Sequence, residues 1–147
     1  MRLADYVANF IAARASRVYG VCGAGAMHLN DAIASHPRLK VIAHHHEQAA
    51  TYAAEADARV ANKPAFVSVT TGPGGSNTLT GVACAYVDSI PLMIIAGQVT
   101  SATMRDNGIR QRGMNELDMV AMMQPVTKLA MTLTDPGMVR YWLEKLF

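Results

Sequence analysis

The side chain of this 147-residue sequence that is best placed for acid–base chemistry is a glutamate, in the run His46-Glu47-Gln48. The run follows the apolar residues Val41-Ile-Ala43 and precedes an alanine-rich segment, which predicts a carboxylate where a buried strand turns into a helix. A helix N-terminus stabilises a negative charge by about 0.3–1 kcal/mol. From its position alone, therefore, Glu47 is explained better by a structural role than by catalysis.

Two further turns place polar side chains directly after apolar strands. One carries the run Thr70-Thr-Gly-Pro-Gly-Gly-Ser-Asn77, and the other places Gln98 after Leu92-Met-Ile-Ile-Ala96. Taken alone, the first turn is either a capped helix start or an anion cradle, and it lacks the lysine of a phosphate-binding loop. Gln98 is as well explained by a turn as by a ligand contact. Turns that follow parallel strands meet at one edge of the sheet, so the three together predict a site there.

Neither the histidines nor the cysteines predict a metal site. His44 to His46 are consecutive, and neighbouring strand residues point to opposite faces, so they cannot converge on one ion. Cys22 and Cys84 stand alone, without the spacing of metal ligands. Two isolated cysteines are typical of reduced thiols, and we therefore expect a cytoplasmic protein.

The composition limits the kinds of partner that this protein is expected to bind. Charged residues make up 16% of the chain and the formal net charge is +2, which argues against nucleic acid and against an anionic membrane surface. No apolar stretch reaches the length of a membrane span. Because hydrophobic residues make up 51%, we expect partner chains or further domains to cover part of the surface.

Apolar periodicity and turn residues predict alternating helices and strands. Helices are expected over residues 3–11, 27–35, 47–62, 73–86, 115–123 and 139–147, and strands over 17–22, 41–43, 65–70, 92–96 and 127–132. Such alternation predicts an α/β fold, with a doubly wound parallel sheet between two layers of helices. Residues 100–113, with Asp106-Asn-Gly108, are expected to form a long loop, and loops of this length are commonly functional.

The motifs of the chain occur in one characteristic order. They are His46-Glu-Gln-Ala-Ala50, Ala58-Arg59, Lys63-Pro64, Thr71-Gly-Pro-Gly-Gly-Ser-Asn77, Thr80-Gly-Val-Ala83, Asp88-Ser-Ile-Pro91, Gly97-Gln-Val99 and Arg110-Gln-Arg-Gly-Met-Asn-Glu-Leu-Asp118. This order closely resembles that of the pyrimidine-binding N-terminal domain of thiamine diphosphate-dependent enzymes, in particular the acetolactate synthase-like branch. The resemblance extends over nearly the whole of residues 1–147.

The resemblance implies a role for each matching residue. Glu47 would hydrogen-bond N1′ of the aminopyrimidine ring of the cofactor, and by placing a proton there it would activate the thiazolium toward a 2-oxo acid. The residues that would form the walls around this ring and the reacting centre are Gly23, Thr70, Pro73, Asn77 and Gln98. The implied activity is carboligation or decarboxylation of 2-oxo acids.

The resemblance also implies partners. In the family the diphosphate and Mg²⁺ are held by a separate domain with a Gly-Asp-Gly motif, which is absent from this sequence. We therefore expect residues 1–147 to be one pyrimidine-binding domain from a longer enzyme, without the last strand of its fold and inactive alone. The diphosphate-binding domain would come from a partner subunit of a homodimer or homotetramer. FAD is a further cofactor that the resemblance allows.

Two other readings stay open at this point. The chain could be the small subunit of a two-subunit 2-oxo acid decarboxylase, or a non-catalytic assembly module. Three positions also depart from the family pattern: Ala56-Asp57 replaces the usual Gly-Tyr, Cys22 replaces a common proline, and Asn115 stands where glutamine is frequent. The last of these leaves the choice of substrate open.

Overall fold

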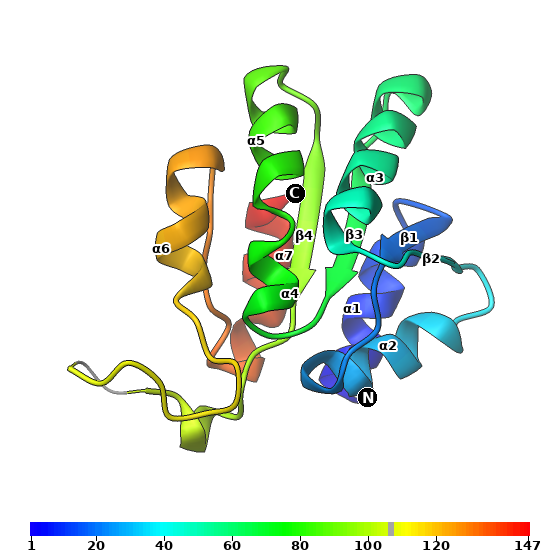
Figure 1. Cartoon of the computed structure of the whole chain (residues 1–147). Coiled ribbons are helices and arrows are strands. Elements are labelled where there is room, and N and C mark those ends of the chain that lie inside the picture. The colour runs from blue at the N-terminus through cyan, green and yellow to red at the C-terminus, as the bar shows by residue number, and fades with distance from the viewer. Residues whose placement is uncertain (106–107) are drawn as a thin grey trace.

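A single sheet of four parallel strands forms the centre of the computed structural model, which describes residues 1–105 and 108–147 (Figure 1). The strands are β1 (Arg17–Gly20), β2 (Lys40–Ala43), β3 (Ala65–Val69) and β4 (Leu92–Ala96), in the order β2-β1-β3-β4. Helices cover both faces, which confirms the predicted three-layer α/β fold class. Asp106 and Asn107, in the predicted long loop, lie outside the described residues.

Seven α-helices occur in the described part of the chain. They are α1 (Leu3–Ala12), α2 (Met27–Ala34), α3 (Glu47–Ala61), α4 (Pro73–Ser76), α5 (Leu79–Val87), α6 (Met119–Met123) and α7 (Val139–Leu146). Short 3-10 turns precede α2, follow β4 and α6, and lead into α7. Within the described ranges no helix is both long enough and apolar enough to cross a membrane.

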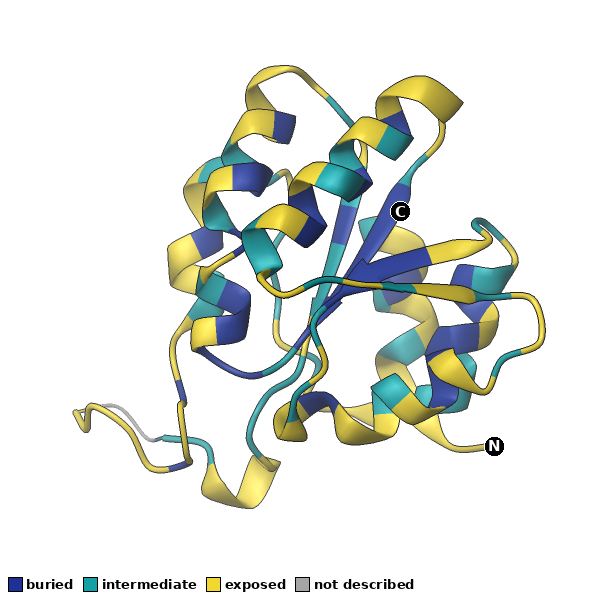
Figure 2. Ribbon diagram, turned by 45° about the vertical axis from the view of Figure 1, so that its right-hand side comes forward, coloured by how far each residue is buried: buried dark blue, intermediate teal, exposed yellow. Residues whose placement is uncertain are grey.

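Side chains alternate along β3, so the core is divided between the two faces of the sheet. Figure 2 shows buried residues on the strands and on the helices that cover them. Phe66 points to the face covered by α1, α2 and α7, where it joins Ile11, Ile33 and Leu143. Val67 and Val69 point to the opposite face, where the alanines of α3 pack against them: Ala50, Ala54 and Ala58. All five residues of β3 are buried, as expected for a central strand covered on both faces.

Close packing of α3 against α5 depends on a glycine. A Cβ on Gly81 would lie 2.6 Å from Cγ2 of Thr51, so only glycine allows this approach. The small residues of α3 have two different roles. Of these, Ala50 and Ala54 are fully buried against the sheet, whereas the contact with α5 is made by Thr51.

Three predicted elements differ clearly from the structure. The helix expected over residues 115–123 begins only at Met119, where the side chain of Asp118 caps it by accepting from the N–H of Ala121 at 3.0 Å.

The helix expected over residues 73–86 is divided into α4 and α5, because the Thr78 hydroxyl donates to the carbonyl oxygen of Gly75 at 2.7 Å where one helix ends. The strand expected over residues 127–132 is wrong. This described segment joins no sheet, because a strand requires a neighbouring backbone and the apolar pattern alone does not supply one.

The strand order places a ligand crevice at a definite point. The chain passes from β1 to β2 on one side and then returns to β3 on the other side of β1, so the direction of winding reverses between β1 and β3. Ligands of open α/β sheets bind beyond the carboxyl ends of the strands at such a switch point. The residues that follow β1 and β3, namely 21–25 and 70–74, therefore occupy the favoured position.

Candidate functional site

Glu47 is the first residue of α3, and the helix start is fixed by the residue before it. His46 has extended backbone angles, and its Nδ1 accepts a hydrogen bond from the backbone N–H of Gln48 at 3.1 Å. This is an N-cap in which an imidazole takes the place of the more usual hydroxyl or carboxylate. His44 also has a local role, since its Nδ1 lies 2.9 Å from the carbonyl oxygen of Ile42. Two of the three histidines thus make local backbone contacts.

The carboxylate of Glu47 is half-buried and points toward the glycine-rich turn. Its Oε2 accepts a hydrogen bond from Nδ2 of Asn77 at 2.9 Å. Asn77 lies at the junction of α4 and α5, so the break between these helices places its side chain. A Cβ on Gly74 would lie 3.5 Å from Oε1 of Glu47, in ordinary van der Waals contact. Cγ2 of Thr70 would lie only 2.7 Å from the same Cβ, so glycine at this position lets Thr70 pack beside the carboxylate.

Thr70 lies at the centre of the switch point. Its Oγ1 accepts a hydrogen bond from the backbone N–H of Gly25 at 3.1 Å, which joins the turn after β1 to the turn after β3. Added Cβ atoms on Gly23 and Gly74 would lie 2.5 Å and 2.7 Å from side-chain carbons of Thr70. Only glycine permits these contacts, so the backbone of both turns packs against the side chain of Thr70.

Pro73 and Gln98 occupy different surroundings. Pro73 is the first residue of α4, a position that suits its fixed φ and its missing N–H, and its ring is exposed. Gln98 is half-buried, and its Oε1 accepts from the N–H of Val99 at 2.9 Å while its Nε2 donates to the carbonyl oxygen of Leu117 at 3.4 Å. The structure therefore brings Glu47, Thr70 and Asn77 together with Gly23 and Gly74 nearby, and it directs the amide of Gln98 toward the following loop.

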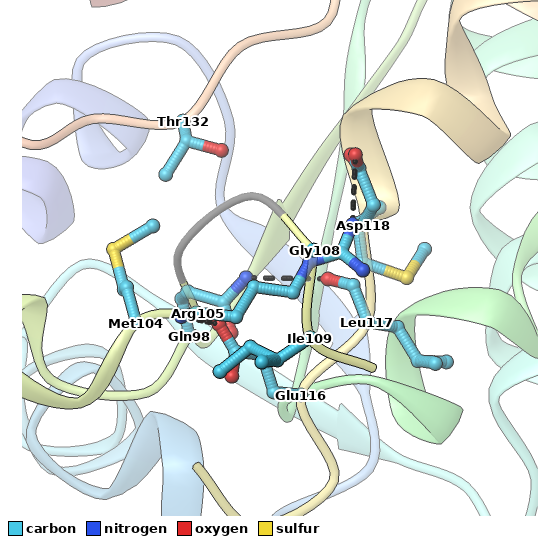
Figure 3. Close-up of a pocket in the computed structure, with 10 residues that line it drawn as sticks. Gln98, Met104, Arg105, Gly108, Ile109, Glu116, Leu117, Asp118 and Thr132 are labelled. Carbon is cyan, nitrogen blue, oxygen red and sulfur yellow. Dashed lines mark hydrogen bonds and ion pairs between the residues drawn. The ribbon is translucent and has the colours of Figure 1, made fainter. Parts of the chain in front are cut away.

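A cavity of about 410 Å³ lies beside Gln98 (Figure 3). Arg105 and Asp118 form an ion pair across it, with Nη2 and Oδ2 3.1 Å apart, and Glu116 and Thr132 also border it. Glu47 does not line this cavity. Figure 1 shows the loop after β4 at the carboxyl ends of the strands, and residues of this loop form most of the cavity lining.

Glu116 is the one acidic residue among the buried side chains of the described chain, with 4% of its surface exposed. Its carboxylate accepts hydrogen bonds from three backbone N–H groups: Arg105 at 2.6 Å, Arg112 at 2.8 Å and Gly113 at 3.0 Å. These donors lower the pKa of Glu116 from its ordinary value of 4.5, because they stabilise the ionised form more than burial opposes it.

Two of the departures from the family pattern have a structural explanation. Asp57 on α3 accepts two hydrogen bonds from Arg17 at the start of β1, at 2.7 and 3.2 Å, so it fixes the helix to the sheet. Asn115 has a left-handed backbone with φ of 57°, a conformation that asparagine tolerates better than glutamine does. Cys22 is exposed, and nothing in the structure explains why it replaces proline.

Metal ligands are not gathered in the described residues, where no group of three or more His, Cys, Asp or Glu side chains is arranged to hold an ion. Sequence reasoning did not single out His46 as the helix cap or Glu116 as a buried acceptor. The cap had a signal, because a side-chain acceptor directly before a helix is a standard start signal. Glu116 had none, since its donors come from residues up to 11 positions away.

Comparison with known proteins agrees with this geometry. Residues 1–122 match the family described as thiamine pyrophosphate enzyme, N-terminal TPP binding domain. The acetolactate synthase large subunit of Haemophilus influenzae is 40% identical over 111 residues, which are 76% of this chain and 18% of that protein. The large subunit of acetolactate synthase isozyme 3 of Escherichia coli is 34% identical over 131 residues, which are 89% of this chain and 22% of that protein.

A third relative, the acetolactate synthase large subunit of Buchnera aphidicola from Schizaphis graminum, is 38% identical over 111 residues, or 76% of this chain and 19% of that protein. The chain therefore spans about a fifth of the length of these relatives. Because the family match covers most of the sequence and the observed sheet has the expected parallel topology, the chain belongs to the thiamine pyrophosphate enzyme family, in which it corresponds to the N-terminal TPP-binding domain.

Proposed function

We propose that this chain supplies the aminopyrimidine-binding half of an acetolactate synthase-like enzyme that joins or decarboxylates 2-oxo acids with thiamine diphosphate. The observation that carries the proposal is the placement of Glu47. Its carboxylate stands at the carboxyl edge of the sheet, held by Asn77 on one oxygen and bordered by Gly74 at the other. The named activity of the relatives, acetolactate synthase, supports the reaction class.

The residues present fit an aminopyrimidine ring. Such a ring needs an acid for N1′ and a neighbouring surface without a Cβ, so that a flat group can lie against the chain. Within the described residues, Asn77 donates the hydrogen bond that the Glu47 carboxylate accepts, and the accepting oxygen is Oε2. Oε1 faces the position that a Gly74 Cβ would otherwise fill. A carboxylate oxygen and a glycine backbone therefore lie side by side at this edge of the sheet.

Each residue then has a defined task. Glu47 holds a proton between its carboxylate and N1′, and Asn77 fixes the orientation of that carboxylate. Thr70 holds the turn at Gly25 and the turn at Gly74 together beside the carboxylate of Glu47. Thiamine diphosphate, when bound, supplies the thiazolium carbon that adds to a 2-oxo acid and the electron sink for the reaction. The protein contributes geometry and proton placement.

We further propose that the diphosphate and Mg²⁺ are held by a diphosphate-binding domain of a partner subunit, within a homodimer or homotetramer. The half-buried state of Glu47 supports this arrangement, because a second domain is needed to exclude water from the acid. By itself the chain is expected to be inactive. The exposed, unpaired thiols of Cys22 and Cys84 support a cytoplasmic location.

The test is the substitution Glu47→Gln in the protein at its full natural length, loaded with thiamine diphosphate and Mg²⁺. Glutamine keeps the shape of the side chain and its acceptor for Asn77 but cannot share an acidic proton. We expect exchange of the cofactor C2 proton, followed by ¹H NMR in D₂O, to slow by about 10²- to 10⁴-fold.

Glu144→Gln is the matched control, because Glu144 is an exposed residue of α7 whose described partner is Arg140 in the same helix. It should leave the exchange rate unchanged. An exchange rate in Glu47→Gln equal to that of the unmodified protein would contradict the proposed role of Glu47.

A further inference from the structure

The carboxylate of Glu116 closes a loop of the backbone. Its Oε1 binds the N–H of Arg105 on the outgoing limb, and its Oε2 binds the N–H groups of Arg112 and Gly113 on the returning limb. Figure 3 shows Glu116 beneath Arg105 at the edge of the cavity. Hydrogen bonds to a charged acceptor are about twice as strong as neutral ones. One buried side chain thus joins the backbone of the two limbs, which the ion pair between Arg105 and Asp118 also connects.

The returning limb, residues 112–117, lies between the turn after β4, which carries Gln98, and the turn after β3, which carries the glycine-rich segment. On one side, a Cβ on Gly113 would lie 2.4 Å from Cγ1 of Val99, and the carbonyl oxygen of Leu117 accepts from Gln98. On the other side, the carbonyl oxygen of Asn115 would lie 1.7 Å from a Cβ on Gly72. The limb is therefore in contact with the chain directly after β4 and with the chain directly after β3.

We infer that Glu116 is a positioning residue of the reacting centre: by fixing residues 112–117 it sets the place of Gln98 and of the turn at Gly72. The inference rests on the proposed function, in which Gln98 borders the reacting centre. Glu116 touches neither substrate nor cofactor in this arrangement and acts through the backbone. Its effect should fall on substrate binding, whereas proton placement by Glu47 should be untouched.

The substitution Glu116→Gln isolates this role. Glutamine has the same shape, but one of its two polar ends is an NH₂ group, which cannot accept from a backbone N–H. At least one of the three donors would lose its acceptor and face a second donor. Glu116→Asp retains the charge with a shorter reach, and it serves as the second variant if Glu116→Gln fails to fold.

The first measurement is hydrogen–deuterium exchange of the backbone, which requires no activity. In Glu116→Gln, within the peptide containing residues 105–113, the amides of Arg105, Arg112 and Gly113 should exchange about 10- to 100-fold faster than in the unmodified protein, because they lose a charged acceptor. The Glu144→Gln control should not change it. Unchanged exchange in this peptide would overturn the inference whether or not the proposed function is correct.

The second measurement separates positioning from general stability. In the full-length protein with thiamine diphosphate and Mg²⁺, Glu116→Gln should raise KM for pyruvate, used as the probe 2-oxo acid, about tenfold, while C2 proton exchange stays unchanged. Combined with Gln98→Ala, its effect on KM should be less than additive, since both changes act on the same group. Unchanged KM, or full additivity, would overturn the positioning role.

Absence of C2 exchange in the unmodified protein would instead refute the proposed function. The exchange measurement on the backbone would still decide whether Glu116 fixes the loop.

Discussion

Two glutamates of this chain lie near the carboxyl ends of the strands, and their surroundings are opposite. Glu47 is half-buried, and within the described residues its carboxylate receives one hydrogen bond, from a side chain. Glu116 is buried, and its carboxylate receives three, all from backbone N–H groups. The Glu47 carboxylate therefore keeps acceptor sites for a ligand, whereas both oxygens of Glu116 accept hydrogen bonds from the protein itself.

The comparison teaches how to separate a reactive acid from a structural one. A carboxylate that accepts several backbone hydrogen bonds is held in its ionised form, as the lowered pKa of Glu116 shows. Such a group is a poor proton donor. A carboxylate with a free oxygen beside a glycine surface can share a proton with a ring nitrogen. If burial were the criterion, Glu116 would be chosen as the reactive acid. The number of hydrogen-bond donors to each carboxylate instead indicates Glu47.

The glycine-rich turn can be used to test this difference between the two glutamates. Gly72 contacts the loop that Glu116 holds, and Gly74 lies beside Glu47. The substitution expected to have the largest effect on stability is Gly72→Ala. It places a Cβ at φ of 57° and 1.7 Å from the carbonyl oxygen of Asn115. We expect a loss of about 2–4 kcal/mol in the free energy of unfolding, measured with urea.

Gly108→Ala is the control for backbone strain. Gly108 also has a positive φ, of 101°, but a Cβ there would meet nothing within 4 Å. It should cost about 1–2 kcal/mol. If Gly72→Ala costs no more than Gly108→Ala, the contact between the turn and Asn115 does not stabilise the protein.

The next effect in size should come from Gly74→Ala, which acts on the side of Glu47. Its Cβ would lie 2.7 Å from Cγ2 of Thr70, so this threonine must move and the surroundings of Glu47 change. Thiamine diphosphate affinity should fall about tenfold or more, measured by calorimetry on the full-length protein with Mg²⁺.

Thr70→Ser offers a specific rescue of that variant. It removes Cγ2 but keeps the Oγ that accepts from Gly25. The double variant Thr70→Ser/Gly74→Ala should recover affinity to within about threefold of Thr70→Ser alone. Failure of this rescue would show that the glycine is required by the ring rather than by Thr70.

The smallest effect is the pH dependence that Glu116 should impose. Its pKa in the folded state is lowered below 4.5, so its stabilising contribution is complete above pH 4.5 and is lost as the pH falls through the lowered value. The difference in the free energy of unfolding between the unmodified protein and Glu116→Gln should therefore narrow below pH 4.5. A difference that is constant from pH 7 to pH 3 would show that ionisation of Glu116 does not stabilise the fold.

Local sequence was a good guide wherever local chemistry decides the structure. β4 was predicted with its observed bounds, and the predicted bounds of β3 and α3 were within one residue, because Pro64, the alanine run and the glycine turn act on their own neighbours. It failed at residues 127–132, where a strand depends on a partner that the pattern does not contain. It also failed to find the break at Thr78, since a helical pattern continues through it.

The sequence by itself determined the parallel α/β class, the family and the candidate acid, because periodicity, turn residues and motif order are written along the chain. Only the tertiary structure decided which groups surround that acid. The bond from Asn77 joins residues 30 positions apart, and the carboxylate of Glu116 receives one of its three donors, Arg105, from 11 positions away. Such contacts depend on how the turns pack at the carboxyl edge of the sheet, where a glycine allows approaches that no local pattern specifies.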